Sequence, residues 1–142
     1  MKKADENVAL FIGAHPDDAE FLCAGTLALL HERGWSIHIA TLAPGDKGTV
    51  SHSREEISRI RQEEGRQAAA VLGGEYHCLL AEDAYIIYDR ELLNRTADLV
   101  RRVRPRMVFT TPLDDYMIDH QESGKLAQTA CFACGIKNLE VE

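Results

Sequence analysis

The sequence lacks both a long apolar run and an excess of basic residues. No stretch is long and apolar enough to cross a bilayer, and residues 1–6 lack the apolar core of a signal peptide. Lys and Arg number 16 against 23 Asp and Glu, for a net charge of -7, and no basic stripe is present to follow a phosphate backbone. We therefore expect a cytoplasmic protein that binds neither membranes nor nucleic acid.

A disulfide framework is missing as well. The four cysteines lie mostly in apolar segments, where a free thiol behaves as a small buried hydrophobe: Cys23, Cys78, Cys131 and Cys134. The last two have Cys-x-x-Cys spacing, but a zinc ribbon needs a second such pair. We interpret them as two core thiols on one helix face, in a protein of a reducing compartment.

What is present is the composition of one soluble domain. Of 142 residues, 45% are apolar and 27% charged. Four strand-like runs alternate with four helical patterns, an order that favours an α/β fold, here a Rossmann-like three-layer sandwich with a mostly parallel sheet. The strands are expected at residues 8–13, 36–42, 76–80 and 107–111, and the helices at about 19–33, 53–72, 89–104 and 120–134. Residues 139–142 alternate as the start of another strand would, so we predict one domain over residues 1–142 whose C-terminal part is missing.

Local signals mark several helix ends. Ser53 and Glu56 have capping-box spacing at the start of a long helix. Asp89 can cap the next helix, and Pro105 stops it. The expected buried side of the long helix consists of Ile57, Ile60, Glu64, Ala68 and Val71.

The first strand runs directly into a histidine and two adjacent carboxylates. The segment reads Gly13-Ala14-His15-Pro16-Asp17-Asp18-Ala19-Glu20. In an open parallel sheet, ligands bind at the carboxyl ends of the strands. Asp17 could instead be a helix N-cap with Glu20 as its capping-box partner. Capping explains one carboxylate, but it leaves unexplained why His15 and a second acid crowd the same turn, where repulsion between the acids favours a cation.

A second acidic cluster follows the fourth strand. It reads Asp114-Asp115-Tyr116-Met117-Ile118-Asp119-His120. If the strands follow the usual doubly wound order, the first and fourth are neighbours and the two clusters face each other. A metal held by His15, Asp18 and His120 would then have three protein ligands and an open position for water, as in catalytic zinc sites. Asp119 as a plain N-cap of the last helix is a compatible reading.

Residues 14–20 resemble the signature of the LmbE/PIG-L family of zinc-dependent N-acetylglucosaminyl de-N-acetylases. Residues 61–73 and 104–112 resemble the family's long helix and its approach to the second metal motif, so the resemblance spans essentially the whole chain. It implies a single LmbE-like deacetylase domain with Zn²⁺ or another divalent transition metal as cofactor. It also implies a small-molecule partner, an N-acetylated sugar or conjugate. Assembly into a homo-oligomer is left open.

The resemblance implies a role for each matching residue. His15, Asp18 and His120 would be the zinc ligands, and Asp17 would be the general base. Asp119 would lie behind the ligands and orient a histidine ring. Zinc lowers the pKa of its bound water to about 7, which supplies hydroxide at neutral pH.

Five further positions are matched less firmly or depart from the family. Arg61 and Asp83 match positions that contact substrate in some members, with a solvated surface charge as the alternative reading. Met117 replaces a family histidine that helps to stabilise the oxyanion, and a thioether cannot do so. A tyrosine that acts as an acid in some members corresponds to Asp115, with Tyr116 one residue later.

Three functions are therefore weighed. The first is a metal-dependent hydrolase that removes an N-acyl group, such as acetyl, from an amino sugar or sugar conjugate. The second is a family amidase that cleaves a larger conjugate. The third, a non-hydrolytic Rossmann-like nucleotide-binding module, would need Gly-x-Gly-x-x-Gly after the first strand, where this chain instead has carboxylates that would repel a pyrophosphate. His31, His38 and His77 lie inside predicted helices or strands and are interpreted as structural or surface residues.

Overall fold

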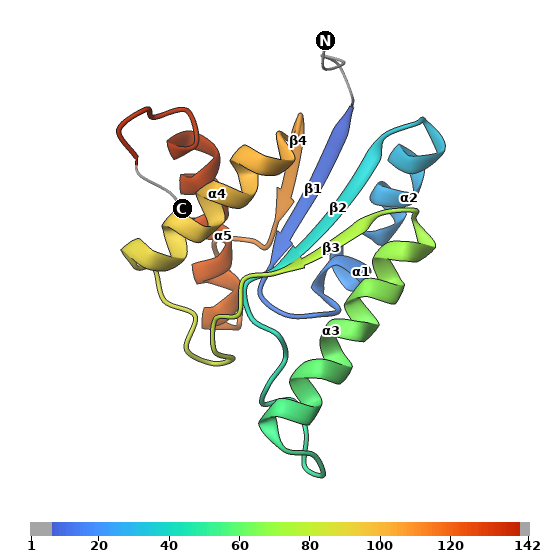
Figure 1. The fold of residues 1–142 in the computed structure, drawn as a ribbon, viewed down its shortest axis with the longest axis vertical. Helices are drawn as coiled ribbons and strands as arrows, with labels where there is room; N and C mark the ends of the chain where they lie inside the picture. The colour runs from blue at the N-terminus through green and yellow to red at the C-terminus, as the bar shows by residue number, and fades with distance from the viewer. Residues whose placement is uncertain (1–6, 140–142) are drawn as a thin grey trace.

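The computed structural model describes residues 7–139, which are built around a four-stranded sheet. The strands are β1 (Val8–Gly13), β2 (Ser36–Thr41), β3 (Glu75–Cys78) and β4 (Met107–Thr110), in the order β3-β2-β1-β4. All three pairings are parallel (Figure 1). β1 lies between β2 and β4, as predicted, so the loops that follow β1 and β4 meet at one edge of the sheet.

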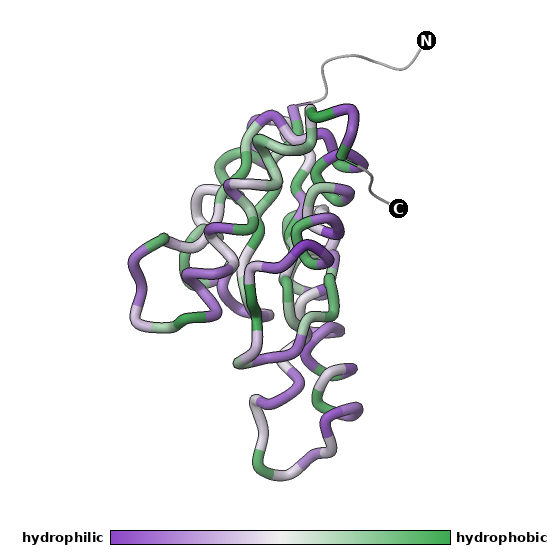
Figure 2. The backbone as a smooth tube through the Cα atoms, turned by 90° about the vertical axis from the view of Figure 1, so that its left-hand side faces the viewer, coloured by the Kyte–Doolittle hydropathy of each residue, from purple (hydrophilic) through white to green (hydrophobic). Residues whose placement is uncertain are grey.

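Within residues 7–139, five helices cover the two faces of the sheet. α1 (Asp18–Leu22), α2 (Ala24–Glu32) and α3 (Arg54–Val71) pack on one face, and α4 (Arg90–Val103) and α5 (Ile118–Ala133) on the other. Figure 2 shows hydrophobic and hydrophilic residues alternating along the helices, as expected when one side of each faces a sheet. The predicted three-layer sandwich is confirmed. None of these described helices combines the length and apolarity needed to cross a membrane.

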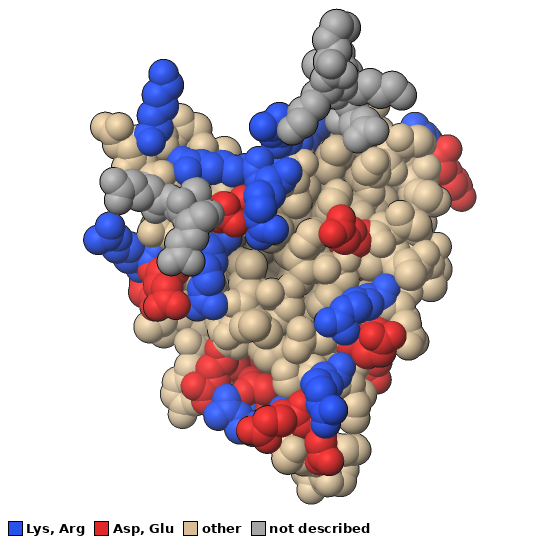
Figure 3. All heavy atoms as spheres, viewed as in Figure 1, with Lys and Arg blue, Asp and Glu red and all other residues tan. Residues whose placement is uncertain are grey.

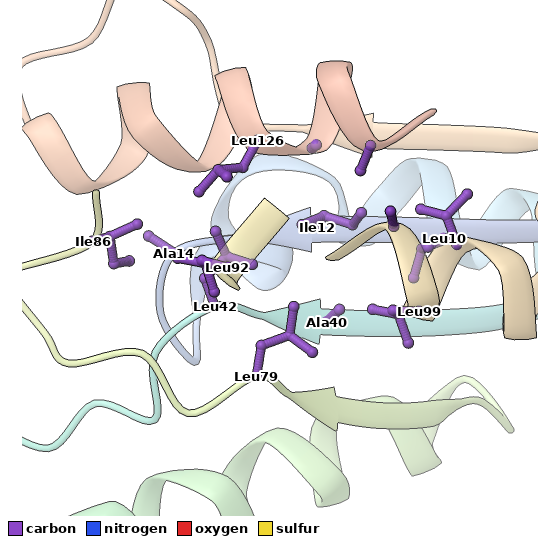
Figure 4. Close-up of a cluster of buried hydrophobic side chains, with 14 of the residues drawn as sticks. Leu10, Ile12, Ala14, Ala40, Leu42, Leu79, Ile86, Leu92, Leu99 and Leu126 are labelled. Carbon is purple, nitrogen blue, oxygen red and sulfur yellow. The ribbon is translucent and has the colours of Figure 1, made fainter. Parts of the chain in front are cut away.

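The core lies on both sides of β1. Every residue of this strand is buried, with Leu10 and Ile12 on the side of α4 and α5 and Phe11 on the opposite side. Figure 4 shows Leu10 and Ile12 in one apolar cluster with Leu99 of α4 and Leu126 of α5. Burial on both faces explains why β1 is a continuous apolar run in the sequence.

Two helix starts follow the predicted signals. The Ser53 side chain accepts a hydrogen bond from the Glu56 amide, and the Glu56 carboxylate accepts one from the Ser53 amide, so the capping box is present. Asp89 caps α4 by accepting from the amide of Leu92 at 2.8 Å.

The helix expected over residues 19–33 is in fact two helices. Cys23 interrupts it with a φ of -140°, which is not helical. Ala19, Cys23 and Leu27, at spacings of four residues, all reach the apolar cluster on this face of the sheet.

The buried side of α3 also differs from the prediction. Ile57, Gly65 and Ala69 are buried, whereas Ile60 and Val71 are exposed. Gly65 explains why the buried side of α3 is turned from the predicted one. A Cβ at Gly65 would lie 2.6 Å from Cε2 of Tyr76, so β3 packs against α3 at this glycine.

The C-terminal end differs from the prediction at one cysteine and at the start of its expected strand. Cys131 is exposed, so its interpretation as a core thiol is wrong, whereas Cys134 is half-buried and packs against the core cluster. Of the strand expected over residues 139–142, Leu139 is irregular and the remainder lies outside the described residues.

Candidate active site

The loop after β1 is shaped by Asp18, the first residue of α1. Its Oδ2 accepts hydrogen bonds from the backbone amides of Ala14 (2.7 Å) and His15 (2.9 Å). Gly13 cannot carry a side chain, because a Cβ there would lie 2.6 Å from the Phe11 ring and 2.9 Å from the Asp18 Cβ. With Oδ2 occupied by amides, the other oxygen of Asp18 lies 3.3 Å from Nε2 of His120.

Asp17 occupies the N-cap position of α1 without capping the helix. Its φ of 108° lies in the left-handed region, where Asn and Asp are tolerated better than most residues. Among the residues that the structure describes, its side chain makes no capping hydrogen bond. Oδ2 instead accepts a hydrogen bond from Nη2 of Arg61 on α3, at 2.7 Å. The helix-cap reading of Asp17 is therefore wrong, and its carboxylate lines a cavity.

α5 contributes two buried residues from its first turn. Asp119 and His120 are 4% and 8% exposed, and the N-cap position belongs to Met117, so the reading of Asp119 as an N-cap is wrong. Asp119 Oδ2 lies 2.9 Å from Nε2 of His15. Asp115 Oδ1 lies 3.2 Å from Nδ1 of His120. Each imidazole thus has a carboxylate on one ring nitrogen, an arrangement that orients metal-binding histidines.

His15, Asp18 and His120 together fit a divalent cation. One donor atom from each lies within 4.8 Å of the other two. Two imidazole nitrogens and one carboxylate oxygen suit Zn²⁺ and other divalent transition ions. Ligand atoms about 2.0 Å from a tetrahedral ion are about 3.3 Å apart. The separation of Asp18 and His120 already equals this spacing, at 3.3 Å.

This cluster lines a cavity of about 880 Å³ formed by the loops that follow all four strands. All of the site residues expected from the sequence lie on its wall. Its charged groups are five carboxylates and two cations: Asp17, Asp18, Asp83, Asp115, Asp119, Lys47 and Arg61. Figure 3 shows Asp and Glu gathered near the lower end of the molecule, below the carboxyl ends of the strands, with a few cationic side chains among them.

Asp83 holds the loop after β2 against the cavity. Its two oxygens accept hydrogen bonds from the amides of Gly45 (3.0 Å) and Lys47 (3.1 Å), and its own amide donates to Asp46 (3.0 Å). Burial raises the pKa of Asp83 and outweighs the opposing effect of these hydrogen bonds. The residue is 7% exposed, so its reading as a solvated surface charge is wrong.

Arg61 enters the site from α3. It donates to the Pro16 carbonyl (2.5 Å) and to Asp17, and it pairs with Glu64 on its own helix. A Cβ at Gly45 would lie 3.0 Å from Cγ of Arg61, so the glycine lets the loop pass close to this side chain. Arg61 is therefore built into the cavity wall, and Glu64, which had been expected on a mostly apolar side, serves as its partner.

The chain matches the PIG-L family profile, described as GlcNAc-PI de-N-acetylase, over residues 10–131. It belongs to this family. The matched region contains both loops of the candidate metal centre, and the resemblance expected from the sequence is confirmed.

Relatives of this PIG-L chain include deacetylases and a hydratase. It is 32% identical over 130 residues to 4-oxalmesaconate hydratase from Pseudomonas putida, covering 86% of this chain and 50% of that protein. It is 29% identical over 142 residues to diacetylchitobiose deacetylase from Thermococcus kodakarensis, covering 95% and 53%. The crystal structure of N,N'-diacetylchitobiose deacetylase from Pyrococcus horikoshii matches with a TM-score of 0.88 and 27% identity, covering 95% of this chain and 53% of that one. The chain thus spans about half the length of these relatives.

The apolar rim of this PIG-L site was missed by the sequence reasoning. Phe21 and Leu22 are 84% and 54% exposed, and both line the cavity beside the metal cluster. Tyr116, on the opposite loop, is 87% exposed and packs edge-on against His120 with ring centroids 5.6 Å apart. The available signal was a pair of large apolar residues directly after the first motif, next to the expected metal ligands.

Proposed function

We propose that this chain catalyses the metal-dependent hydrolysis of an N-acyl group, in the first instance acetyl, from an amino sugar or sugar conjugate. The observation that carries the proposal is the convergence of His15, Asp18 and His120 on one cavity, with the carboxylate of Asp17 beside them. Membership of the PIG-L family and the deacetylase relatives support the same reaction. We assign Zn²⁺ as the cofactor because the donor set suits it.

A cation held by these three residues would lower the pKa of bound water and polarise the acyl carbonyl. Asp17 is the group that we assign to take the proton of the attacking water. Arg61 holds this carboxylate from 2.7 Å, so the base has a fixed position before substrate binds. The carboxyl group, once protonated, can pass its proton to the leaving nitrogen, which releases a free amine and a carboxylic acid.

Asp119 and Asp115 are assigned as positioning residues for the two imidazoles. Asp119 accepts hydrogen bonds from the amides of Ala84 (2.7 Å) and Ile86 (3.3 Å) in addition to its contact with His15. These amides fix its carboxylate, so the orientation of the His15 ring depends on the loop after β3.

Met117 leaves the oxyanion without the imidazole donor that is frequent in the family. Tyr116 is the neighbouring side chain with an O–H group, and it lines the same cavity. We therefore assign its hydroxyl as a donor to the oxyanion.

Addition of water to a double bond is the second candidate, because a hydratase is 32% identical to this chain. Both reactions use an activated water and a base, so the metal centre does not separate them. The cavity wall favours deacetylation: Lys47 is paired with Glu82 and Arg61 with Asp17, and three more carboxylates face the cavity besides Asp17 and Asp18. A bound divalent cation would offset part of this negative charge, and the remainder disfavours a carboxylated substrate relative to a neutral N-acetylated sugar. The same charge disfavours a nucleotide.

The proposal is tested by measuring metal content and two enzymatic activities on the same protein preparation. Metal-loaded protein is offered N-acetylated monosaccharides, disaccharides and larger conjugates, and amine release is measured beside the loss of ultraviolet absorbance of conjugated unsaturated acids. Amine release that stops after chelation supports the proposal. Loss of absorbance without amine release would establish hydratase activity instead. Inactivity on both the N-acetylated compounds and the unsaturated acids would contradict both candidates.

A further inference from the structure

A second histidine cluster lies on the sheet, away from the cavity. β2 and β3 are parallel with His38 opposite Glu75 and Ala40 opposite His77, so these side chains share one face. That face is the one covered by α4 and α5, because His38 is in register with the core residue Leu10. Two strands therefore place two imidazoles and a carboxylate side by side.

The distances within this cluster fit a metal ion. Nδ1 of His38 lies 2.9 Å from Nε2 of His77 and 3.7 Å from Oε2 of Glu75. Tetrahedral ligands are about 3.3 Å apart, so shifts of about 0.4 Å bring these atoms to ligand spacing. The two rings are stacked, with centroids 5.2 Å apart and an interplanar angle of 14°. All three donor atoms lie within 4.8 Å of one another.

The cluster can be reached from solvent on the side of its carboxylate. Glu75 is 69% exposed, which gives an ion access from solvent. The guanidinium of Arg102 is a positive charge near His77. It is paired with Asp98 at 2.7 Å, which offsets its repulsion of a metal ion.

We propose that His38, Glu75 and His77 bind a divalent transition cation that joins β3 to β2. Among the described strands, β3 is an edge strand and forms strand pairs with β2 alone. A cation bound by residues of both strands would cross-link β3 to β2. Because β3 leads directly to Asp83 on the cavity wall, this cross-link would also steady that part of the wall. The site goes beyond the proposed hydrolase activity and uses none of its residues.

Zinc titration of a His15→Ala/His120→Ala double variant tests the site with the first centre removed. We expect this variant to bind one equivalent of Zn²⁺ and its Tm to rise by about 3 to 6 °C at zinc concentrations well above Kd. Adding His38→Ala or His77→Ala should abolish both effects. His31→Ala, which changes a histidine on α2, is the matched control and should alter neither. Absence of zinc binding in the folded double variant overturns the proposal.

A single change in the otherwise intact chain gives a second test that does not depend on the double variant folding. Glu75→Gln alters an exposed side chain and should weaken the second zinc equivalent by ~10-fold or more, since even outer-shell changes have effects of that size. The first equivalent and the hydrolase activity should be unchanged. An isotherm identical to that of the unaltered chain overturns the proposal.

Discussion

Asp17→Asn should abolish most turnover while leaving the fold and the metal centre intact. Asn tolerates the left-handed φ of 108° as well as Asp does, and its carbonyl oxygen can still accept a hydrogen bond from Arg61. The substitution removes basicity and little else, because within residues 7–139 the Asp17 side chain caps no helix amide. Ala at this position would add backbone strain and is the poorer choice.

The magnitude separates a catalytic role from a structural one. Loss of a general base lowers kcat by ~100 to 10,000-fold. This corresponds to about 2.7 to 5.4 kcal/mol in the activation free energy, at 1.36 kcal/mol for each factor of ten. Loss of an N-cap would instead lower the free energy of unfolding by about 0.5 to 2 kcal/mol and leave kcat unchanged. The two roles therefore predict different results in kinetics and in thermal unfolding.

The assay combines amine release at saturating substrate, metal analysis and Tm on the same protein. Asp114→Asn, which changes an exposed acid on the loop after β4, is the matched control and should keep full activity. A decrease of less than tenfold for Asp17→Asn, with metal retained, would refute the assignment of Asp17 as the base. A lower Tm with unchanged kcat would restore a structural role.

His15→Ala and His120→Ala should each strip most of the metal from the centre, measured by elemental analysis, and full occupancy in both would disprove the ligand assignment. Asp119→Asn should weaken metal binding by ~10 to 100-fold, because the His15 ring loses the carboxylate that orients it; an unchanged affinity in chelator competition would count against that role. Met117→His should raise kcat and Tyr116→Phe should lower it, since an oxyanion donor is worth ~2.7 to 4 kcal/mol. If neither changes kcat, the oxyanion depends on other groups.

Much of the fold could be predicted because its signals are local. Ser53 and Asp89 begin their helices with side-chain hydrogen bonds that depend on neighbouring residues alone. The break at Cys23 could not be predicted, because residues 19–33 show one helical pattern throughout. The break is visible only in the backbone of Cys23, whose φ of -140° is not helical.

The site was predictable in its residue types and less so in its contacts. The rule that ligands bind at the carboxyl ends of parallel strands brings the loops of Asp18 and His120 together without any coordinates. Which carboxylate lies behind which imidazole depends on how the loop after β4 folds, and Asp115 and Asp119 turn to different rings. Asp83 becomes buried only because the loop after β2 folds over it, and nothing in its own segment signals this.

The two histidine clusters hold the same donor types but differ in what supports them. His15 and His120 are each bonded to an aspartate that orients the ring, and the other nitrogen of His120 lies 3.3 Å from Asp18. His38 and His77 are bonded to each other, so a cation must replace that hydrogen bond before it can bind. A site whose imidazoles are already oriented by carboxylates binds metal more tightly. The first cluster also opens on the large cavity, whereas the second lies between two strands, so catalysis is favoured at the first and stabilisation of the sheet edge at the second.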